Sequence, residues 1–199
     1  MERFQNTNLP DWDWWGKLWP APGETLRELG VAAGDRLVEI GSGDGYFALP
    51  AARIVAPAPV YALDLDASLL ADLEQLADQQ ELGNVVTKHG DARSLSEHVP
   101  EPVDVALIAN AFHGIEDREA FVTEAASVLA DGGRLVVVNW RAIPREATAI
   151  DGEPRGPPTD LRLTPAETNA AVESAIGATE CTQFDLPPYH YGLVFEPSR

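Results

Sequence analysis

One short stretch of the sequence combines an acidic residue with three closely spaced glycines. Glu39 is followed by Gly41, Gly43 and Gly45, so a glycine stands at every second position. Glycine has no Cβ, and the backbone can therefore turn with positive φ and approach a ligand closely. Residues 36–40 form a short apolar run suited to a buried strand, and the apolar spacing after Gly45 is helical. This order indicates a nucleotide site, because unpaired backbone N–H groups and the positive end of the helix dipole face the loop.

The spacing of the glycines separates two families of nucleotide sites. The dinucleotide fingerprint is G-x-G-x-x-G, whose third glycine comes one position later than Gly45. The pattern present here, acid-x-G-x-G-x-G, resembles the first motif of the class I S-adenosylmethionine (SAM)-dependent methyltransferases. The resemblance implies that Glu39 lies near the amino group of the methionine part. It also implies that Gly41, Ser42, Gly43 and Gly45 bind the cofactor as the loop passes under it.

Two further carboxylates follow predicted strands. Asp64 comes about 20 residues after Gly43, the distance at which a carboxylate meets the ribose hydroxyls in doubly wound folds. Asp91 belongs to a Gly-Asp-Ala turn that resembles the adenine-recognition turn of the same family, in which the aspartate accepts a hydrogen bond from the adenine amino group. By this resemblance Leu65 and Ala92, next to the two acids, also bind the cofactor. The alternative for Asp91 is a simple turn residue.

The residues after the fourth predicted strand face the expected position of the methyl group. In the family, the Asn110 position contacts the methionine part through its backbone, so Asn110 is assigned to cofactor binding. His113 could take a proton from a hydroxyl or an activated carbon of the acceptor. Its alternative is a hydrogen-bonded pocket residue without a proton role. A base is needed only if the acceptor is still protonated near pH 7, because methyl transfer mainly requires alignment and the exclusion of water.

Candidates for the acceptor pocket come from both ends of the chain. Four of the five tryptophans lie within residues 12–19, where they either attach the N-terminal segment to the domain or form a wall of the pocket. Three arginines, Arg141, Arg155 and Arg162, could hold a carboxylate or phosphate of the acceptor, or could neutralise the acidic surface. The candidates for the pocket are Trp14, Trp15, Asn139, Arg141 and Tyr189.

Strands alternate with helices five times, which predicts an α/β fold with a parallel sheet and right-handed crossovers. With the family resemblance, which covers residues 30–196, this is a doubly wound, Rossmann-like, seven-stranded and mostly parallel sheet. Helices cover both faces, and a C-terminal antiparallel hairpin completes the sheet. We expect residues 1–30 to form an aromatic lid or cap and residues 31–199 to form the methyltransferase domain. The predicted strands are 36–40, 60–64, 85–89, 103–109, 134–140, 179–185 and 191–196.

Local signals set the predicted helices. Helices are expected over 22–29, 69–82 with Asp66 as its cap, 117–129, and from 165 to Gly177 after the cap Thr164. Pro50 predicts that the helix after the glycine loop starts late or kinks. Residues 130–133 are expected to form a turn. Residues 141–163 are rich in proline, and we expect them to form a long ordered loop over the carboxyl ends of the strands.

Composition narrows the function. The 199 residues include 32 Asp and Glu against 14 Lys and Arg, giving a net charge of −18 and an isoelectric point near 4.4. Such a chain repels nucleic acid and anionic membranes. It resembles proteins of salt-adapted organisms, although an ordinary acidic protein is the alternative. The single cysteine excludes a disulfide framework and a multi-cysteine metal site, so no metal is expected. Neither a membrane-spanning run nor a signal peptide is recognised, so we expect a cytoplasmic monomer or homodimer.

Three functions therefore remain. The first is a SAM-dependent methyltransferase acting on a small molecule, with resemblance to the quinone-biosynthesis C-methyltransferases. The second is a SAM-binding module without catalysis, or one that modifies a protein partner. The third is an NAD-linked oxidoreductase, which the early third glycine and Asp91 argue against.

Overall fold

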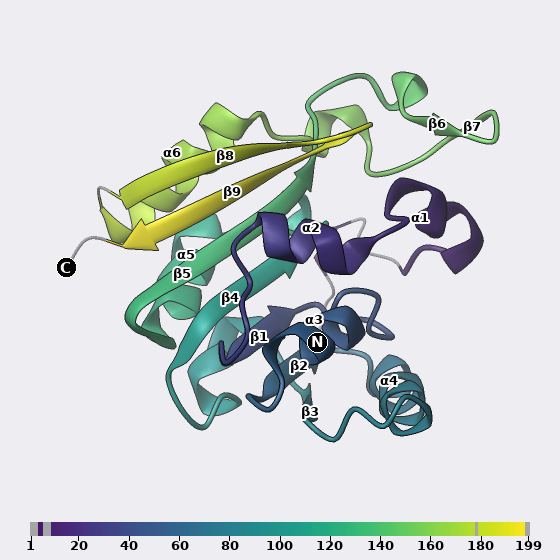
Figure 1. Ribbon diagram of the computed structural model, residues 1–199. Coiled ribbons are helices and arrows are strands. Elements are labelled where there is room, and N and C mark those ends of the chain that lie inside the picture. The colour runs from purple at the N-terminus through teal and green to yellow at the C-terminus, as the bar shows by residue number, and fades with distance from the viewer. Residues whose placement is uncertain (1–3, 6–8, 178, 198–199) are drawn as a thin grey trace.

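The computed structural model describes residues 4–5, 9–177 and 179–197. A seven-stranded sheet with the strand order β3-β2-β1-β4-β5-β9-β8 runs through its centre (Figure 1). The strands from β3 to β5 are parallel, whereas β9 runs antiparallel to β5 and β8 antiparallel to β9. This confirms the predicted fold class. The strands are β1 Leu37–Ile40, β2 Val60–Asp64, β3 Val85–His89, β4 Val103–Ala109, β5 Leu129–Trp140, β8 Thr179–Leu186 and β9 His190–Pro197.

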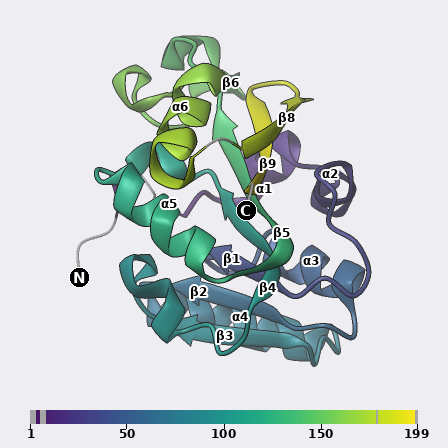
Figure 2. The same cartoon turned by 90° about the vertical axis from the view of Figure 1, so that its left-hand side faces the viewer.

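Helices cover both faces of this sheet. One face carries α1 Trp12–Leu18, α2 Pro22–Glu28, α3 Ala48–Val55 and α4 Ala67–Gln79. The other carries the 3₁₀ helix η1 Ala92–Glu97, the short η2 Phe112–Gly114, α5 Arg118–Ser127 and α6 Pro165–Ile176. Figure 2 shows α5 and α6 on one side of the sheet and α2 and α3 on the other. The hydrophobic core is therefore divided by the sheet into two clusters.

Strand periodicity explains how one short strand serves both clusters. Successive side chains of a strand point to opposite faces. In β1, Leu37 joins the cluster under α3, whereas Val38 and Ile40 join the cluster under α5. All four residues of β1 are buried, as expected for a strand in the middle of a parallel sheet. By the same alternation Glu39 shares its face with Leu37.

The local helix signals act as predicted. Asp66 caps α4 by accepting a hydrogen bond from the Ser68 backbone N–H (2.9 Å). Thr164 and Glu167 form a reciprocal capping box at the start of α6. Pro50 is the third residue of α3, where it removes no backbone hydrogen bond from the helix. The helix accordingly starts only at Ala48, after the glycine loop and a turn.

The start of β5 differs from the expectation. We expected a turn at 130–133 before a strand at 134–140, but β5 already begins at Leu129, which pairs with Val103. The pairing register shifts between Val103 and Val105, and Gly132 has a positive φ of 75°. The irregularity that the Asp-Gly-Gly sequence produces is therefore a bulge-like interruption within one long strand.

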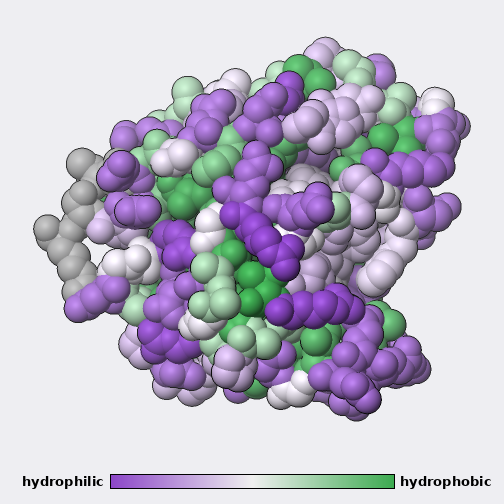
Figure 3. Space-filling view, in the orientation of Figure 1, coloured by the Kyte–Doolittle hydropathy of each residue, from purple (hydrophilic) through white to green (hydrophobic). Residues whose placement is uncertain are grey.

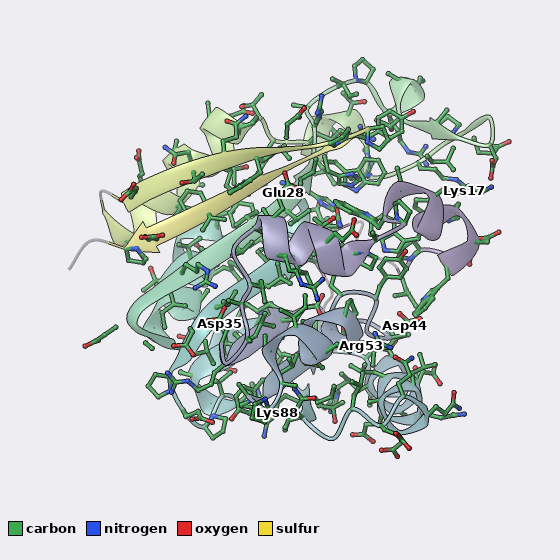
Figure 4. The ribbon with its side chains drawn as sticks, in the orientation of Figure 1. Lys17, Glu28, Asp35, Asp44, Arg53 and Lys88 are labelled. Atoms are coloured by element: carbon green, nitrogen blue, oxygen red, sulfur yellow. The ribbon has the colours of Figure 1, made fainter. Side chains whose placement is uncertain are left out.

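Two further segments gather at the carboxyl end of the parallel strands. The sequence did not predict helix α1, whose Trp15 and Leu18 are buried in the same core cluster as α3. Residues 141–163 contain more regular structure than expected, namely η3 Arg145–Ala147, β6 Ala149–Ile150, β7 Glu153–Pro154 and η4 Thr159–Leu161. Figure 1 shows the β6–β7 hairpin beside α1, and Lys17, labelled in Figure 4, joins them by an ion pair with Asp151.

The surface is mainly hydrophilic. Figure 3 shows smaller hydrophobic areas between hydrophilic ones on the face that carries α2 and α3. Within residues 4–5, 9–177 and 179–197, no helix is long and apolar enough to cross a membrane. Over the same residues, no group of three histidine, cysteine or acidic side chains is arranged to hold a metal ion.

Candidate functional site

A cavity of about 430 Å³ opens at the carboxyl ends of β1, β2 and β4. Its volume is within the range of small-molecule sites, about 300–1,000 Å³. Doubly wound sheets bind ligands at this edge, outside the carboxyl ends of their strands. The cavity has two parts: a floor of glycine loop and strand ends, and a wall from α1, Trp140 and residues 145–157.

The glycine loop forms the floor, and its backbone requires glycine. Gly41, Gly43 and Gly45 have φ values of 74°, 55° and 94°, in the left-handed region that side chains disfavour. A Cβ on Gly45 would lie 2.2 Å from the Leu73 Cδ1 atom. The Leu63 carbonyl, at the end of β2, accepts hydrogen bonds from the N–H groups of Gly41 (2.8 Å) and Ser42 (3.0 Å). The loop is therefore fixed against the strand next to it.

Asp64 connects this loop to β2. Its two carboxylate oxygens accept hydrogen bonds from the N–H groups of Gly43 (2.8 Å) and Asp66 (2.9 Å). Asp64 and the adjacent Leu65 both line the cavity, as the sequence predicted. Each oxygen of an ionised carboxylate can accept more than one hydrogen bond, so Asp64 can still accept from a ligand.

Glu39 lies deepest among the acidic residues of the cavity. It is only 2% exposed, and its Oε2 atom has no hydrogen-bond partner among the described residues. Burial raises the pKa of this carboxyl well above its ordinary value, and the nearby carboxylates of Asp64 and Asp44 raise it further. Buried polar atoms in native proteins normally have partners. The geometry therefore favours a ligand that brings a positively charged donor to Glu39.

The segment after β4 completes the floor. Asn110 has a φ of 59°, and its backbone N–H donates to the Val138 carbonyl (2.8 Å). Both polar atoms of its side-chain amide are buried and unpaired among the described residues. His113, on η2, is 2% exposed and also lines the cavity. Asn110 and His113 are thus brought to the same cavity as the three carboxylates.

Aromatic rings form the facing wall. Trp14 and Trp15 of α1 line the cavity together with Tyr46 and Trp140. The Trp15 ring centroid lies 6.1 Å from that of Tyr46 and 6.4 Å from that of Trp140. The predicted role of Trp14 and Trp15 in a pocket wall therefore agrees with their position. The sequence analysis did not propose Trp140 or Tyr46 as pocket residues. Trp140 could have been proposed, because it is the last residue of the fifth predicted strand and ligands bind at the carboxyl ends of the strands.

The N-terminal segment is also tied to the glycine loop. The Trp12 indole N–H donates to the Asp44 Oδ2 atom at 2.6 Å. Asp44 lines the cavity, and Figure 4 places it toward the end of the molecule where α4 lies. Burial raises the pKa of the Asp44 carboxyl, an effect that the hydrogen bond from Trp12 opposes.

Asp91 does not line the cavity, although its neighbours Gly90 and Ala92 do. Its carboxylate accepts hydrogen bonds from the Arg93 backbone and side chain and caps η1. The Arg93 guanidinium consequently lowers the pKa of Asp91. In this conformation the carboxylate is directed to Arg93, so its assignment to adenine is not supported by its contacts.

Three of the predicted pocket residues also lie outside the cavity lining. Asn139 is fully buried, and its amide lies 3.5 Å from the Tyr191 hydroxyl. Arg141 donates to the His190 carbonyl and pairs with Asp185. Tyr189 stacks on Trp140, with ring centroids 6.4 Å apart, and donates to the Ala149 carbonyl. For Asn139 the physical reason is strand alternation: Trp140 faces the cavity side of β5, so Asn139 faces the other side. Arg141 and Tyr189 lie beyond the strand ends and are held by the contacts just described.

Comparisons with known proteins agree with this geometry. A methyltransferase domain model matches residues 38–137. The ubiquinone/menaquinone biosynthesis C-methyltransferase UbiE of Saccharophagus degradans is 29% identical over 121 residues, which are 58% of this chain and 47% of that protein. The chain spans about half the length of the curated relatives it matches.

Solved structures share the fold. A SAM-dependent methyltransferase from Aquifex aeolicus superposes with a TM-score of 0.75 at 20% identity, covering 89% of this chain and 90% of that one. The complex of DhpI with SAH superposes with a TM-score of 0.69 at 21% identity, covering 94% and 87%. At these identities the likeness concerns the fold.

Proposed function

The chain belongs to the class I SAM-dependent methyltransferases, and from this premise we propose that it transfers the methyl group of SAM to a small molecule. The observation that carries the proposal is the unpaired Glu39 Oε2 atom, buried in a cavity whose floor is the glycine loop. SAM is cationic at both its amino group and its sulfonium. A floor lined by Glu39, Asp44 and Asp64 favours such a ligand over an anionic one.

The residues present fit SAM. Glu39 would hold the amino group, because its free oxygen needs a charged donor. Asp64 would accept from the ribose hydroxyls while it keeps its two backbone hydrogen bonds. The unpaired Asn110 amide offers a donor and an acceptor to the methionine part, in addition to the backbone contact expected there. Leu65, Gly90 and Ala92 line the position left for the adenine.

Bound SAM would supply an electrophilic methyl group on its sulfonium, with sulfur as the leaving group. The protein's own residues align the acceptor and keep water out. Trp14, Trp15 and Trp140 do so as a continuous aromatic wall, in which Trp15 and Trp140 are almost fully buried.

We propose His113 as the residue that takes the proton when the acceptor enters protonated. It is buried, it lines the cavity, and it lies on η2 directly after the Asn110 segment. His113→Asn should slow methyl transfer from labelled SAM by about 10²-fold or more, the usual contribution of a positioned base. The affinity for S-adenosylhomocysteine (SAH) should not change. Equal transfer rates in the two proteins would leave His113 as a residue that only shapes the cavity.

Calorimetry with SAH and with NAD tests the cofactor assignment. We expect SAH to bind and NAD not to bind. Asp64→Ala should weaken SAH binding by about 1–3 kcal/mol, the scale of a lost buried hydrogen bond. Asp78→Ala, an exposed acid on α4, removes the same charge and should have no effect. Binding of NAD instead of SAH would contradict the proposal, and an unchanged SAH affinity in Asp64→Ala would remove Asp64 from the site. Binding of SAH without transfer to any acceptor would favour the non-catalytic alternative.

A further inference from the structure

The two ends of the cavity carry opposite charge. Its acidic floor comes from β1, the glycine loop and β2, as described above. The wall opposite contains Arg145 and Arg155, both from the loop between β5 and α6. Asp11, just before α1, also lines the cavity; Asp11 and Arg145 are exposed, whereas Arg155 is half-buried. In a chain with only 14 basic residues, two arginines at one cavity wall require an explanation.

Both guanidinium groups have unused hydrogen-bonding capacity. Neither arginine makes an ion pair with any carboxylate in the described part of the chain. The Arg155 Nε atom is buried and has no hydrogen-bond partner there. The Arg145 side chain donates to the Gly156 carbonyl (3.0 Å) through Nε alone, which leaves its terminal NH₂ groups unpaired within the same residues. A guanidinium fork with free edges matches a carboxylate, which it can bind through two parallel hydrogen bonds.

The wall is held in place by a third arginine beneath it. Arg162 is 5% exposed and donates to the carbonyls of Pro157, Ile143 and Arg155 and to the Thr148 hydroxyl. Its guanidinium lies 5.2 Å from the Trp140 ring centroid, and burial lowers its pKa to about 10. The guanidinium N–H groups of Arg162 thus donate mainly to backbone carbonyls of the loop. Its role is to fix residues 143–157, so that Arg145 and Arg155 are presented by a rigid support.

Flat rings adjoin the free guanidinium groups. The Arg155 guanidinium carbon lies 4.9 Å from the Trp14 ring centroid, and such stacking over the ring face leaves the N–H edges available. The Gly156 backbone packs so closely against Trp140 that a Cβ at this position would lie 2.7 Å from the indole. Trp140 is only 2% exposed, with Gly156, Arg162 and Tyr189 against it, so it leaves little ring surface for a ligand. The rings that can lie beside a planar ligand are those of Trp14 and Trp15, whose centroids are 5.4 Å apart.

We propose that the methyl acceptor is a planar aromatic compound that carries a carboxylate, with its ring beside Trp14 and Trp15 and its carboxylate on Arg145 and Arg155. The inference rests on the proposed function, since it concerns the acceptor side of the same cavity. A neutral acceptor such as a quinone can accept single hydrogen bonds through its carbonyl oxygens, but it brings no negative charge and no pair of oxygens to match the guanidinium fork. The site therefore selects against it, because polar groups left unpaired on binding reduce affinity.

The test measures binding to the SAH-saturated protein by tryptophan fluorescence and calorimetry. The probes are benzoate, 4-hydroxybenzoate and cinnamate, each paired with its neutral amide, together with phenyl phosphate. The variants are Arg145→Gln, Arg155→Gln and Arg155→Lys, which keeps the charge but loses the fork. Arg53→Gln is the matched control, because Arg53 lies on α3, donates to Gln80 and does not line the cavity.

We expect at least one carboxylate to bind tenfold or more tightly than its amide. Arg145→Gln and Arg155→Gln should each lose tenfold or more of that affinity, Arg155→Lys should lose an intermediate amount, and Arg53→Gln should lose none. SAH affinity should stay within twofold in all variants, which also shows that they are folded. If SAH does not bind the wild type, the proposed function itself fails. If SAH binds but no carboxylate is preferred, including the case in which no probe binds, only this inference is overturned. Tighter binding of phenyl phosphate than of every carboxylate would likewise overturn the carboxylate assignment.

Discussion

Among the single residues of the cavity floor, the Glu39 carboxylate does not contribute to the stability of the protein without ligand. Glu39 is buried, has an unpaired oxygen and lies near two other acids, and each of these conditions disfavours its charged form. Burying a charge without a partner reduces stability. The residue is therefore understood best through the ligand that pairs with it, which is a common balance between stability and function at binding sites.

Glu39→Gln should stabilise the free protein and weaken SAM binding. The folded-state pKa of Glu39 is raised, so the stability associated with its neutral form is present at low pH and lost as pH rises through that pKa. The variant should melt at the same temperature as the wild type near pH 4 and at a higher temperature at pH 8. SAM affinity should fall by about 1.5–3 kcal/mol, the value of a hydrogen bond to a charged group. Thermal melts with and without SAM measure both effects.

Glu28→Gln is the control for this experiment. Glu28 is exposed at the end of α2, and Figure 4 shows it at the opposite end of that helix from α1. The Glu28→Gln substitution removes one negative charge at a residue that does not line the cavity. If the two variants gain the same stability at pH 8, the gain reflects net charge and not the burial of Glu39.

At the scale of elements, the glycine loop works as a spacer between β1 and α3 that also packs against α4. The left-handed backbone at Gly45 leads into the turn that precedes α3 at Ala48, and the Leu73 side chain fills the space where a Cβ would be. The same loop donates backbone hydrogen bonds to the Asp64 carboxylate and to the Leu63 carbonyl. Loop conformation, helix position and cofactor floor therefore depend on one another.

Gly45→Ala and Gly34→Ala separate backbone strain from packing. Both glycines have φ near 90°, but a Cβ on Gly34 meets nothing within 4 Å, whereas one on Gly45 meets Leu73. Gly34→Ala should cost about 1–2 kcal/mol from the left-handed backbone alone. Gly45→Ala should cost about 2–5 kcal/mol, because overpacking adds to the strain. Urea unfolding measures both values, and equal losses would show that Leu73 moves aside freely.

At the scale of the whole molecule, the net charge of −18 is the dominant feature. Both lysines are placed far apart in Figure 4, with Lys17 near α1 and Lys88 on the edge strand β3. Some of the 14 basic side chains are engaged in partly buried ion pairs, such as that of Arg36 with Asp104 (3.0 Å). The remaining acidic surface repels itself, and this repulsion decreases as salt screens it.

The melting temperature should rise between 0.1 M and 2 M KCl. A rise of about 2–4 °C corresponds to roughly 1 kcal/mol for a domain of this size. The increase should shrink at pH 5, closer to the isoelectric point of 4.4, because less charge is left to screen. A melting temperature that stays flat or falls with KCl at pH 7.5 would reject the proposed salt adaptation.

Features of the protein that depend on neighbouring residues could be predicted before the structure was known. Strand alternation, the helix caps at Asp66 and Thr164, the late start of α3 near Pro50 and the glycines of the loop are all local effects. The position of Asp64 also follows, since a doubly wound sheet places the end of its second strand beside the glycine loop. For this reason the sheet and the family could be predicted, together with the glycine loop and Asp64 at the floor of the cavity.

Which side chains form the wall of the cavity depends on contacts that appear only in the folded chain. The one-residue alternation along β5 directs Trp140 into the cavity and Asn139 away from it, and this direction depends on the register of the strand in the sheet. Arg141 and Arg155 belong to the same loop, yet one pairs with Asp185 and the other lines the cavity. The path of such a loop is set by contacts between residues distant in sequence, which spacing and composition do not encode.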